Sequence, residues 1–324
     1  MMRVALLDDY QQVSLGLADW KSLEPDAAVT VFADHLSDLD ALARRLQPFE
    51  CVVLMRERTP FPRALFERLP NLKLLITSGR RNAAIDEAAA TDHGVQVCGT
   101  SLAGLATAEL TWGLILACLR HIVAEDKAQR QGRWQTTLGI ELAGKTLGVL
   151  GLGRLGSEVA RIGAAFRMTP IAWSPNLTAE RAAAAGARFV SKDELMAQSD
   201  VLSIHVVLSE RTRGLVGKAD LARMKPAAFL VNTSRGPVVD EDALIDTLRQ
   251  KRIAGAGIDV FSVEPLPPDH AYYRLDNVVI TPHLGYVTAE NYANHFPQVV
   301  EIVRAAIAGR VLQPINQLPA RPGV

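Results

Sequence analysis

The chain has 324 residues, of which 48% are hydrophobic and 22% charged, and it carries a formal net charge of zero with a pI near 7.1. This composition excludes a small disulfide-stapled scaffold, and the balanced charge gives no reason to expect nucleic acid or an anionic membrane as a partner. At roughly 100–200 residues per domain, the length predicts about two domains.

The cysteines and the N-terminus indicate a reducing compartment. Cys51, Cys98 and Cys118 are odd in number, widely spaced and set in apolar runs, so we expect buried free thiols and no metal site. In the first residues, MMRVALLDDY, the apolar run before the two aspartates is too short for a secretion signal. No apolar stretch of the sequence approaches the length of a membrane span. The expected location is the cytoplasm.

The first hundred residues predict a small α/β domain. Short runs rich in β-forming residues alternate with helical patterns, and this alternation favours a mainly parallel sheet. The expected strands are 3–7, 29–32, 51–55 and 72–77, and the expected helices are 37–46 and 61–69.

Two loops of this domain are candidates for ligand binding, because ligands of open parallel sheets bind beyond the carboxyl ends of the strands. These loops, 56–59 and 78–82, hold four arginines, whose planar guanidinium groups can bind an anion through paired hydrogen bonds. The ordinary alternative for any one of them is a solvated basic rim. The four are Arg56, Arg58, Arg80 and Arg81.

Residues 107–122, TAELTWGLILACLRHI, are apolar almost all round. A helix with this pattern is expected to be buried. We place it at the crossing between the two domains.

A glycine-rich turn begins the second domain. The run Lys145–Met168, KTLGVLGLGRLGSEVARIGAAFRM, has the pattern of a strand, a turn and a helix. Gly151 suits the tight turn, Gly153 lets the backbone approach a pyrophosphate, and Gly156 lets the helix lie close to the strand. The amide groups at the start of that helix, together with the helix dipole, form an anion site. The segment therefore predicts dinucleotide binding.

The α/β alternation continues to residue 283 and predicts six parallel strands in this domain. The run Ser191-Lys-Asp-Glu194 has the form of a capping box, which starts a helix before the next strand. A long final helix is expected over 290–308. The strands are 146–150, 170–173, 201–206, 228–231, 253–260 and 278–280, with a further helix over 241–250.

Three polar side chains, Arg235, Glu264 and His283, each follow a predicted strand of this second sheet. Taken singly, they have ordinary explanations as a surface ion pair, a loop carboxylate and an imidazole that caps the core. Together they lie at the carboxyl edge of one sheet whose first turn binds a dinucleotide. The reactive ring of that cofactor would lie at the same edge.

Several motifs, in this order and spacing, resemble those of the D-isomer-specific 2-hydroxyacid dehydrogenases. The resemblance covers nearly the whole chain. It implies two Rossmann-like open parallel-sheet domains, a flavodoxin-like substrate domain made of 1–101 and 287–324 and a larger NAD(P)-binding domain made of 102–286. The motifs are LKLLITSGRRNAAID, GKTLGVLGLGRLG, DVLSIHVVLSERTRGLV, MKPAAFLVNTSRGPVVDEDAL, AGAGIDVFSVEPLP and NVVITPHLGYVTAE.

The same resemblance implies a catalytic triad of Arg235, Glu264 and His283. His283 would exchange a proton with the substrate oxygen as hydride is transferred, a task that suits an imidazole. Glu264 would bind the other ring nitrogen and favour the imidazolium form. Arg235 would bind the substrate carboxylate and polarise the adjacent carbonyl.

Further site residues are also implied by the resemblance. The backbone amides of Ser78 and Gly79, in the loop that continues with Arg80, would hold the substrate carboxylate, and Arg56 matches a position that reaches the substrate in some members.

On the cofactor side, Asp259 and the Thr233 carbonyl would orient the nicotinamide carboxamide, and 205–208 would line the adenosine side. The expected cofactor contacts are Gly151, Gly153, Arg154, Leu155, Gly156, Ser174, His205, Val206, Val207, Thr233 and Asp259.

Two positions depart from the family pattern. The second strand of the cofactor domain ends in Trp173-Ser-Pro-Asn176, without the acid that usually binds the ribose 2′-hydroxyl of NAD. Ser174 and Asn176 suit either a hydroxyl or a phosphate, so we expect NAD and keep NADP as an alternative. Tyr286 stands just after the His283 loop, where we expect a smaller residue. It either contacts the substrate and narrows the pocket or packs between the domains.

The expected activity is reversible hydride transfer between NAD(P) and a small anionic 2-keto or 2-hydroxy acid, of the glyoxylate and hydroxypyruvate type or the phosphoglycerate type. The alternative is an NAD(H)-sensing protein similar to the corepressors on this fold, which keep a similar triad. A formate dehydrogenase is disfavoured, because that group pairs its histidine with Gln. The apolar run 102–122, with Trp112 and Trp134, fits the family's habit of forming a homodimer through the cofactor domain.

Overall fold

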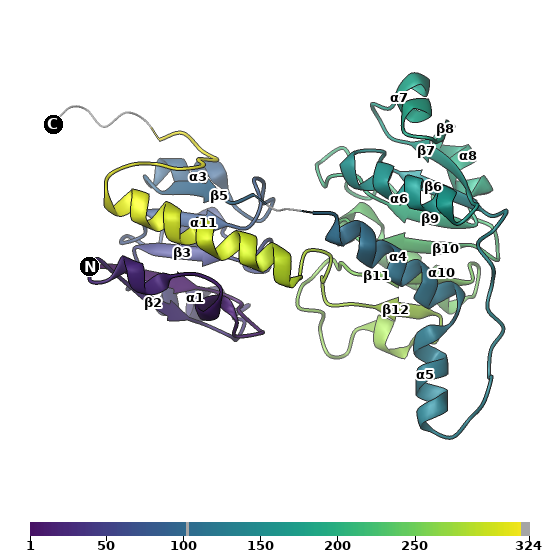
Figure 1. Cartoon of the computed structure of the whole chain (residues 1–324), viewed down its shortest axis with the longest axis horizontal. Helices are drawn as coiled ribbons and strands as arrows, with labels where there is room; N and C mark the ends of the chain where they lie inside the picture. The colour runs from purple at the N-terminus through teal and green to yellow at the C-terminus, as the bar shows by residue number, and fades with distance from the viewer. Residues whose placement is uncertain (102–103, 319–324) are drawn as a thin grey trace. The chain divides into compact units, whose positions relative to one another are not determined.

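The computed structural model describes residues 1–101 and 104–318, and the chain forms two compact units (Figure 1). Unit 1 consists of Met1–Gly104 and Thr288–Val324, and unit 2 of Leu105–Val287. Each unit has its own parallel sheet and its own hydrophobic core. The chain therefore leaves unit 1 once and returns to it with its last long helix.

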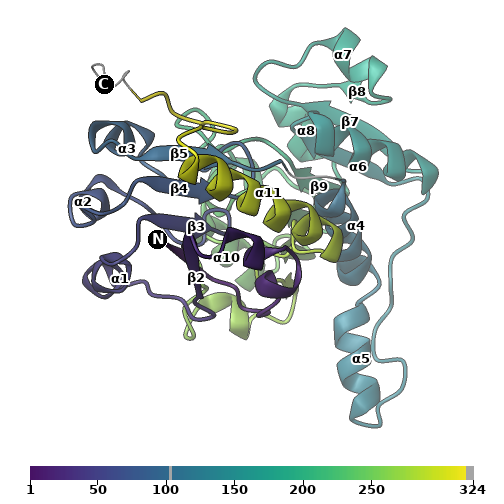
Figure 2. The same cartoon turned by 60° about the vertical axis from the view of Figure 1, so that its left-hand side comes forward.

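Unit 1 contains a five-stranded parallel sheet in the order β2-β1-β3-β4-β5. Its central strands are continuous apolar runs because both faces of the sheet are covered. Three helices cover one face, and the long α11 lies on the other (Figure 2). On that face Phe296 of α11 contacts Trp20. The strands are β1 (Met2–Leu6), β2 (Ala27–Val31), β3 (Cys51–Leu54), β4 (Leu74–Thr77) and β5 (Gln96–Gly99). The helices are η1 (Ser14–Gly16), η2 (Trp20–Leu23), α1 (Leu39–Leu46), α2 (Arg63–Phe66), α3 (Glu87–Asp92) and α11 (Ala289–Ile307).

Unit 2 contains a seven-stranded parallel sheet in the order β12-β11-β10-β9-β6-β7-β8. The order reverses at β6, so the glycine turn after this strand lies at the switch point where open sheets bind ligands. The strands are β6 (Thr146–Leu150), β7 (Thr169–Trp173), β8 (Arg188–Phe189), β9 (Val201–Ile204), β10 (Phe229–Asn232), β11 (Gly255–Ile258) and β12 (Val278–Ile280).

The helices of unit 2 cover both faces of its sheet. Helices α4 and α6 pack on one face, and α8, α9 and α10 pack on the other. The helices are α4 (Ala106–Leu119), α5 (Ile122–Arg130), α6 (Arg154–Ala165), α7 (Ala179–Ala184), α8 (Lys192–Gln198), α9 (Lys218–Leu221), η3 (Gly236–Val238), α10 (Glu241–Arg249) and η4 (Ala271–Arg274).

The two-sheet α/β fold expected from the sequence is confirmed, and two strand predictions, 146–150 and 278–280, coincide with β6 and β12. The predicted capping box is present, because the Glu194 N–H donates to Ser191 Oγ at 3.2 Å and the Ser191 N–H donates to Glu194 Oε2 at 2.8 Å. The expectation of six strands in the second sheet was wrong. The additional strand, β8, is a two-residue edge strand with exposed side chains. It is too short to show the alternation of apolar and polar residues that identifies a strand.

In unit 1 the prediction missed α3 and β5, and α2 is shorter than the expected 61–69. Both missed elements are brief, with six and four residues.

The apolar run 107–122 is not one helix. Helix α4 ends at Leu119, His121 has a left-handed φ of 52°, and α5 begins at Ile122. Helix α4 packs against α6, β10 and β11, so its apolar side chains are buried inside unit 2. Among the described residues no single helix is long and apolar enough to cross a membrane, and α4 with α5 reach that length only as a pair bent by 61°.

A buried histidine makes the stability of unit 1 depend on pH. His295 on α11 is 1% exposed, its Nδ1 lies 2.7 Å from Thr100 Oγ1, and burial lowers its pKa from 6.5 to about 3. Below pH 6.5, His295 therefore binds a proton in the unfolded chain but not in the folded chain, so the free energy of unfolding falls as pH falls.

We expect His295→Asn to remove this dependence, at some cost in stability at pH 7.5 from the smaller side chain. Between pH 6.5 and 4, the unfolding free energy of the wild type should fall more steeply than that of the variant, by up to about 1.4 kcal/mol per pH unit. Urea titrations at several pH values measure this, with His93→Asn, at an exposed position, as the control. Parallel pH slopes in His295→Asn and the wild type would contradict the assignment.

Candidate active site

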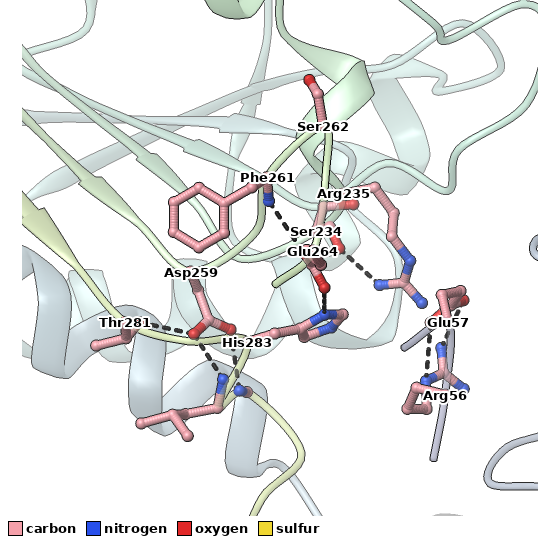
Figure 3. Close-up of polar contacts among 12 residues, drawn as sticks. Arg56, Glu57, Ser234, Arg235, Asp259, Phe261, Ser262, Glu264, Thr281 and His283 are labelled. Atoms are coloured by element: carbon pink, nitrogen blue, oxygen red, sulfur yellow. Dashed lines mark hydrogen bonds and ion pairs between the residues drawn. The ribbon is translucent and has the colours of Figure 1, made fainter. Parts of the chain in front are cut away.

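Three loops of unit 2 meet at one edge of its sheet. Strands β10, β11 and β12 are neighbours in parallel register, with Asn232 beside Ile258 and Ile258 beside Ile280. The carboxyl ends of the three strands therefore lie together. The loops that follow them carry Arg235, Glu264 and His283 respectively (Figure 3).

The loop after β12 is held by a fully buried carboxylate. Asp259 accepts hydrogen bonds from the Thr281 hydroxyl and the Leu284 N–H, both at 2.7 Å, and from the Gly285 N–H at 2.9 Å. Burial raises the pKa of Asp259, and these three hydrogen bonds oppose the rise. His283, inside this loop, has a φ of 52°, a left-handed conformation that costs free energy in a non-glycine residue. The carboxylate thus fixes the backbone of His283 in a strained conformation.

Glu264 and His283 form a close pair. His283 Nδ1 lies 2.6 Å from Glu264 Oε2, while Glu264 Oε1 accepts a hydrogen bond from the Phe261 N–H at 2.9 Å (Figure 3). An ionised carboxylate only accepts, so Nδ1 carries the proton in this contact. The side chains are only 10% and 18% exposed for His283 and Glu264, which limits the competition from water. The other ring nitrogen, Nε2, is therefore the one that could exchange a proton with a substrate.

Arg235 lies on the loop after β10, and the side chain of Asn232 shapes that loop. Asn232 Nδ2 donates to the Arg235 carbonyl and Asn232 Oδ1 accepts from the Ser234 N–H, both at 3.0 Å. A Cβ on Gly236 would lie 2.1 Å from the Phe261 carbonyl carbon, so this glycine lets the Arg235 loop touch the loop that leads to Glu264. Sequence reasoning missed the role of Asn232, although a polar residue at the end of a buried strand is a recognisable signal.

The glycine turn after β6 has the geometry that a dinucleotide requires. Gly151 has a φ of 101°, and a Cβ there would lie 2.7 Å from the Val206 backbone nitrogen. A Cβ on Gly156 would lie 2.0 Å from the Gly151 carbonyl oxygen, whereas one on Gly153 would meet no atom of the described residues within 4 Å. No described side chain caps α6, whose N-terminus begins at Arg154. The first turn of α6, with Leu155 in it, therefore presents backbone N–H groups beside open space, as an anion site does.

The other predicted cofactor residues follow neighbouring strands. Ser174 comes after β7, His205 to Val207 after β9, and Thr233 after β10. His205 Nε2 lies 2.7 Å from Ser203 Oγ, and burial lowers the pKa of His205 to about 4, so this ring is neutral at pH 7. The predicted residues thus line the carboxyl edge of the sheet on both sides of the switch point.

In unit 1, the structure changes the expected role of Ser78. Its N–H donates to the Leu54 carbonyl at 3.2 Å within the sheet, so this amide is not directed at a substrate. Instead, Ser78 Oγ accepts from the Arg56 N–H at 2.9 Å, and its carbonyl accepts from Arg56 Nη1 at 3.0 Å. Ser78 therefore orients Arg56, which also pairs with Glu57 at 3.4 Å (Figure 3). Gly79, with a φ of 90°, supplies the sharp turn that follows.

The four arginines of these loops differ in surroundings. Arg58 is 6% exposed, donates to the Asp8 carbonyl at 2.9 Å and stacks over Tyr10. It supports the first loop of unit 1, so the expectation that it serves as an anion-binding group does not fit its contacts. Arg80 and Arg81 are exposed and follow the Gly79 turn.

Tyr286 is buried beside the candidate catalytic histidine. Its ring meets the His283 ring edge to face, with centroids 5.6 Å apart, and the residue is 6% exposed. This contact within unit 2 keeps the two rings mutually oriented.

Comparisons with known proteins agree on one family. Residues 112–285 match the family described as D-isomer specific 2-hydroxyacid dehydrogenase, NAD binding domain. Glyoxylate reductase of Aeropyrum pernix is 40% identical over 257 residues, 76% of this chain and 77% of that protein. D-3-phosphoglycerate dehydrogenase of Archaeoglobus fulgidus is 36% identical over 88% of this chain, which spans only 53% of the relative's length. The crystal structure of phosphoglycerate oxidoreductase from Vibrio cholerae has a TM-score of 0.90 and 39% identity, over 95% of this chain and all of that one.

The chain therefore belongs to the D-isomer-specific 2-hydroxyacid dehydrogenase family. It is an NAD-dependent oxidoreductase that acts on a CH–OH group, and its two parallel-sheet units have the fold of that family. The open space at Gly153 and the uncapped start of α6 fit the pyrophosphate of NAD. Among the described residues, no three His, Cys, Asp or Glu side chains are grouped to hold a metal ion.

The glycine turn provides a matched pair of substitutions. Gly153→Ala should keep the melting temperature of the wild type but weaken NADH binding by about tenfold or more, because the methyl group fills space beside the pyrophosphate. Gly156→Ala should instead lower the unfolding free energy by roughly 1–3 kcal/mol, because its Cβ has no room. Calorimetric NADH titration and thermal melting measure the two effects. Wild-type NADH affinity in Gly153→Ala would contradict the placement of the cofactor.

Proposed function

We propose that this protein reduces a small 2-keto acid to the D-2-hydroxy acid with NADH, and catalyses the reverse reaction. In this proposal the cofactor domain expected from the sequence, 102–286, binds the cofactor, and the expected substrate domain, 1–101 with 287–324, binds the substrate. The single observation that carries the proposal is the 2.6 Å contact between His283 Nδ1 and Glu264 Oε2 at the edge of the cofactor-binding sheet.

His283 is the acid and base of the proposed reaction. NAD, when bound, supplies or accepts the hydride. In reduction, the Nε2–H of His283 donates its proton to the substrate oxygen, and in oxidation Nε2 takes the hydroxyl proton back. Glu264 holds Nδ1–H and stabilises the positive ring by charge and hydrogen bond. The strained backbone of His283, fixed by Asp259, keeps the ring in one orientation without reorganisation during the reaction.

Arg235, at the sheet edge of unit 2, indicates the substrate class. Arg235 binds the carboxylate of the 2-keto acid, since a planar guanidinium matches a carboxylate with two hydrogen bonds. Unit 1 has its own expected substrate contacts, Arg56, oriented by Ser78, and the loop of Gly79 and Arg80. Tyr286 limits the size of the substrate through its contact with the His283 ring. Relatives named glyoxylate reductase and D-3-phosphoglycerate dehydrogenase support a substrate of the glyoxylate and hydroxypyruvate type or of the phosphoglycerate type.

The ribose end of the cofactor site supports use of NADP as well as NAD. The strand β7 is followed by Ser174-Pro-Asn176, with no acid to bind a 2′-hydroxyl and repel a 2′-phosphate. The Arg181 guanidinium lies against this turn, since its Nη1 donates to the Asn176 carbonyl at 3.2 Å.

The test is oxidation of NADH and of NADPH by the purified protein with glyoxylate, hydroxypyruvate, pyruvate, longer 2-keto acids and 3-phosphohydroxypyruvate. We expect turnover of at least one substrate, and a loss of roughly 10²–10⁴ in rate in His283→Ala. Spectrophotometry at 340 nm measures both. A protein that binds NADH yet reduces none of these acids would contradict the proposal and favour an NADH-sensing protein.

A homodimer through unit 2 is the second part of the proposal. Helix α5 and the chain after it extend away from the sheet of unit 2 in both views (Figures 1 and 2). This arm carries four exposed apolar side chains, and exposed apolar surface of this kind supports a partner. Trp112 is not among them, because it is 5% exposed and its ring stacks on that of Phe166. The arm residues are Ile122 (52% exposed), Val123 (56%), Trp134 (75%) and Leu138 (92%).

Sedimentation equilibrium should show particles of twice the 35.1 kDa chain, and Trp134→Ser with Leu138→Ser should raise the dissociation constant. Val263→Ser, another exposed apolar position outside the arm, is the control. A wild-type protein that stays at the mass of one chain would count against the dimer.

Cytoplasmic location is the third part. The three cysteines, all within the described part of the chain, are free and buried, and burial raises the pKa of Cys98 and Cys118 to about 12. Unpaired thiols suit a reducing compartment. Cell fractionation tests this, and recovery outside the cytoplasmic fraction would refute it.

A further inference from the structure

The segment that carries Glu264 is held in place from outside the triad. Residues 262–270 are the later part of the connection from β11 to η4, and most of them are exposed, Val263 by 62%. Loops with few buried contacts move easily. Yet Glu264 must keep a 2.6 Å contact with His283, so something has to fix the ends of this segment.

One carboxylate on α10 reaches both ends. Glu241 Oε2 accepts a hydrogen bond from the Ser262 N–H at 3.3 Å, and Glu241 Oε1 lies 3.5 Å from His270 Nε2. Both side chains are shielded, with 19% of Glu241 and 17% of His270 exposed. Ser262 and His270 are the first and last residues of the segment, and Glu264 lies between them.

His270 is itself fixed by the structure that follows. Its Nδ1 accepts a hydrogen bond from the Tyr272 N–H at 3.3 Å, and its ring lies 4.9 Å from that of Tyr272. Because Nδ1 accepts, Nε2 carries the proton that points to Glu241. Tyr272 is 2% exposed and packs on Phe261, with ring centroids 6.0 Å apart. These contacts form a continuous chain from Glu241 through His270, Tyr272 and Phe261. The chain ends at Glu264, whose Oε1 accepts a hydrogen bond from the Phe261 N–H.

We propose that Glu241 is a positioning residue for the dehydrogenase reaction, which together with His270 holds segment 262–270 so that Glu264 engages His283. The inference rests on the proposed function of the triad. An acid in the first turn of a helix also stabilises that helix through its dipole, but this applies equally to Asp242, the next residue, which is exposed. The two roles can therefore be separated by comparing the two acids.

The experiment compares Glu241→Ala, Glu241→Gln and Asp242→Asn in the full chain. Asp242→Asn removes the same charge from the same helix turn without touching the segment. In keto-acid reduction we expect Glu241→Ala to lower kcat by roughly tenfold, since small misplacements of catalytic groups have large effects on rate, with KM for NADH unchanged. As pH rises, the activity of Glu241→Ala should be lost at a lower pH than that of the wild type, because Glu264 stabilises the imidazolium of His283 less in this variant. Glu241→Gln keeps one acceptor for the Ser262 N–H and should fall between Glu241→Ala and the wild type, whereas Asp242→Asn should match the wild type.

A second measurement stays valid if the protein reduces no 2-keto acid, in which case the proposed function fails on its own. NMR titration of the His283 ring in the ligand-free protein gives the pH at which it is half protonated. For Glu241→Ala this midpoint should move from the wild-type value toward that of Glu264→Gln, which removes the charge of the partner itself. A His283 midpoint in Glu241→Ala and Glu241→Gln equal to that in Asp242→Asn would overturn the inference, whether or not turnover is found.

Discussion

The chemistry proposed for this protein depends on the buried carboxylate of Asp259. Three hydrogen bonds from Thr281, Leu284 and Gly285 converge on it, and each would leave a costly unpaired group if the carboxylate were removed. The loop they hold contains His283 in a left-handed conformation. The free energy that this conformation costs is offset by the hydrogen bonds around it, so the ring is in place before any substrate arrives. The resemblance to the family assigned Asp259 to the nicotinamide, and the structure adds this second role.

The parallel register of β10, β11 and β12 places two further loops beside the loop of His283. Three neighbouring strands end together, so their loops deliver an arginine, a glutamate and a histidine to one place although these residues are separated by many positions in the chain. Close backbone contact at Gly236 joins two of the loops. Glu264 connects the backbone of one loop with the side chain of another, because one oxygen accepts from the Phe261 N–H and the other contacts the His283 ring. A rigid sheet edge with small, tightly bonded loops is well suited to hold catalytic groups.

Sequence reasoning found the features that local patterns encode. The strand before Gly151 and the strand before His283 were predicted to the residue, because buried parallel strands are short apolar runs with clear polar limits. It failed where structure depends on contacts distant in sequence. The break between α4 and α5 occurs at Arg120 and His121, and the left-handed conformation of His121, a non-glycine residue, was not expected from the sequence. The edge strand β8 exists only because β7 is there to pair with it.

The same limit applies to the candidate site. The candidate triad of Arg235, Glu264 and His283 could be named from motifs, but the support of the His283 loop could not, since the donors to Asp259 lie 22 to 26 positions from it. Arg58 illustrates the reverse error, because its position in a predicted binding loop gave no sign that it binds the Asp8 carbonyl and is buried.

The central claim is that His283 gives a proton in one direction and takes it in the other. The most direct measurement is kcat/KM against pH for both directions, with the same enzyme and substrate pair. Reduction needs the protonated ring and should decline as pH rises, whereas oxidation needs the neutral ring and should increase over the same range, around one common midpoint. Two profiles that rise and fall together would contradict the account.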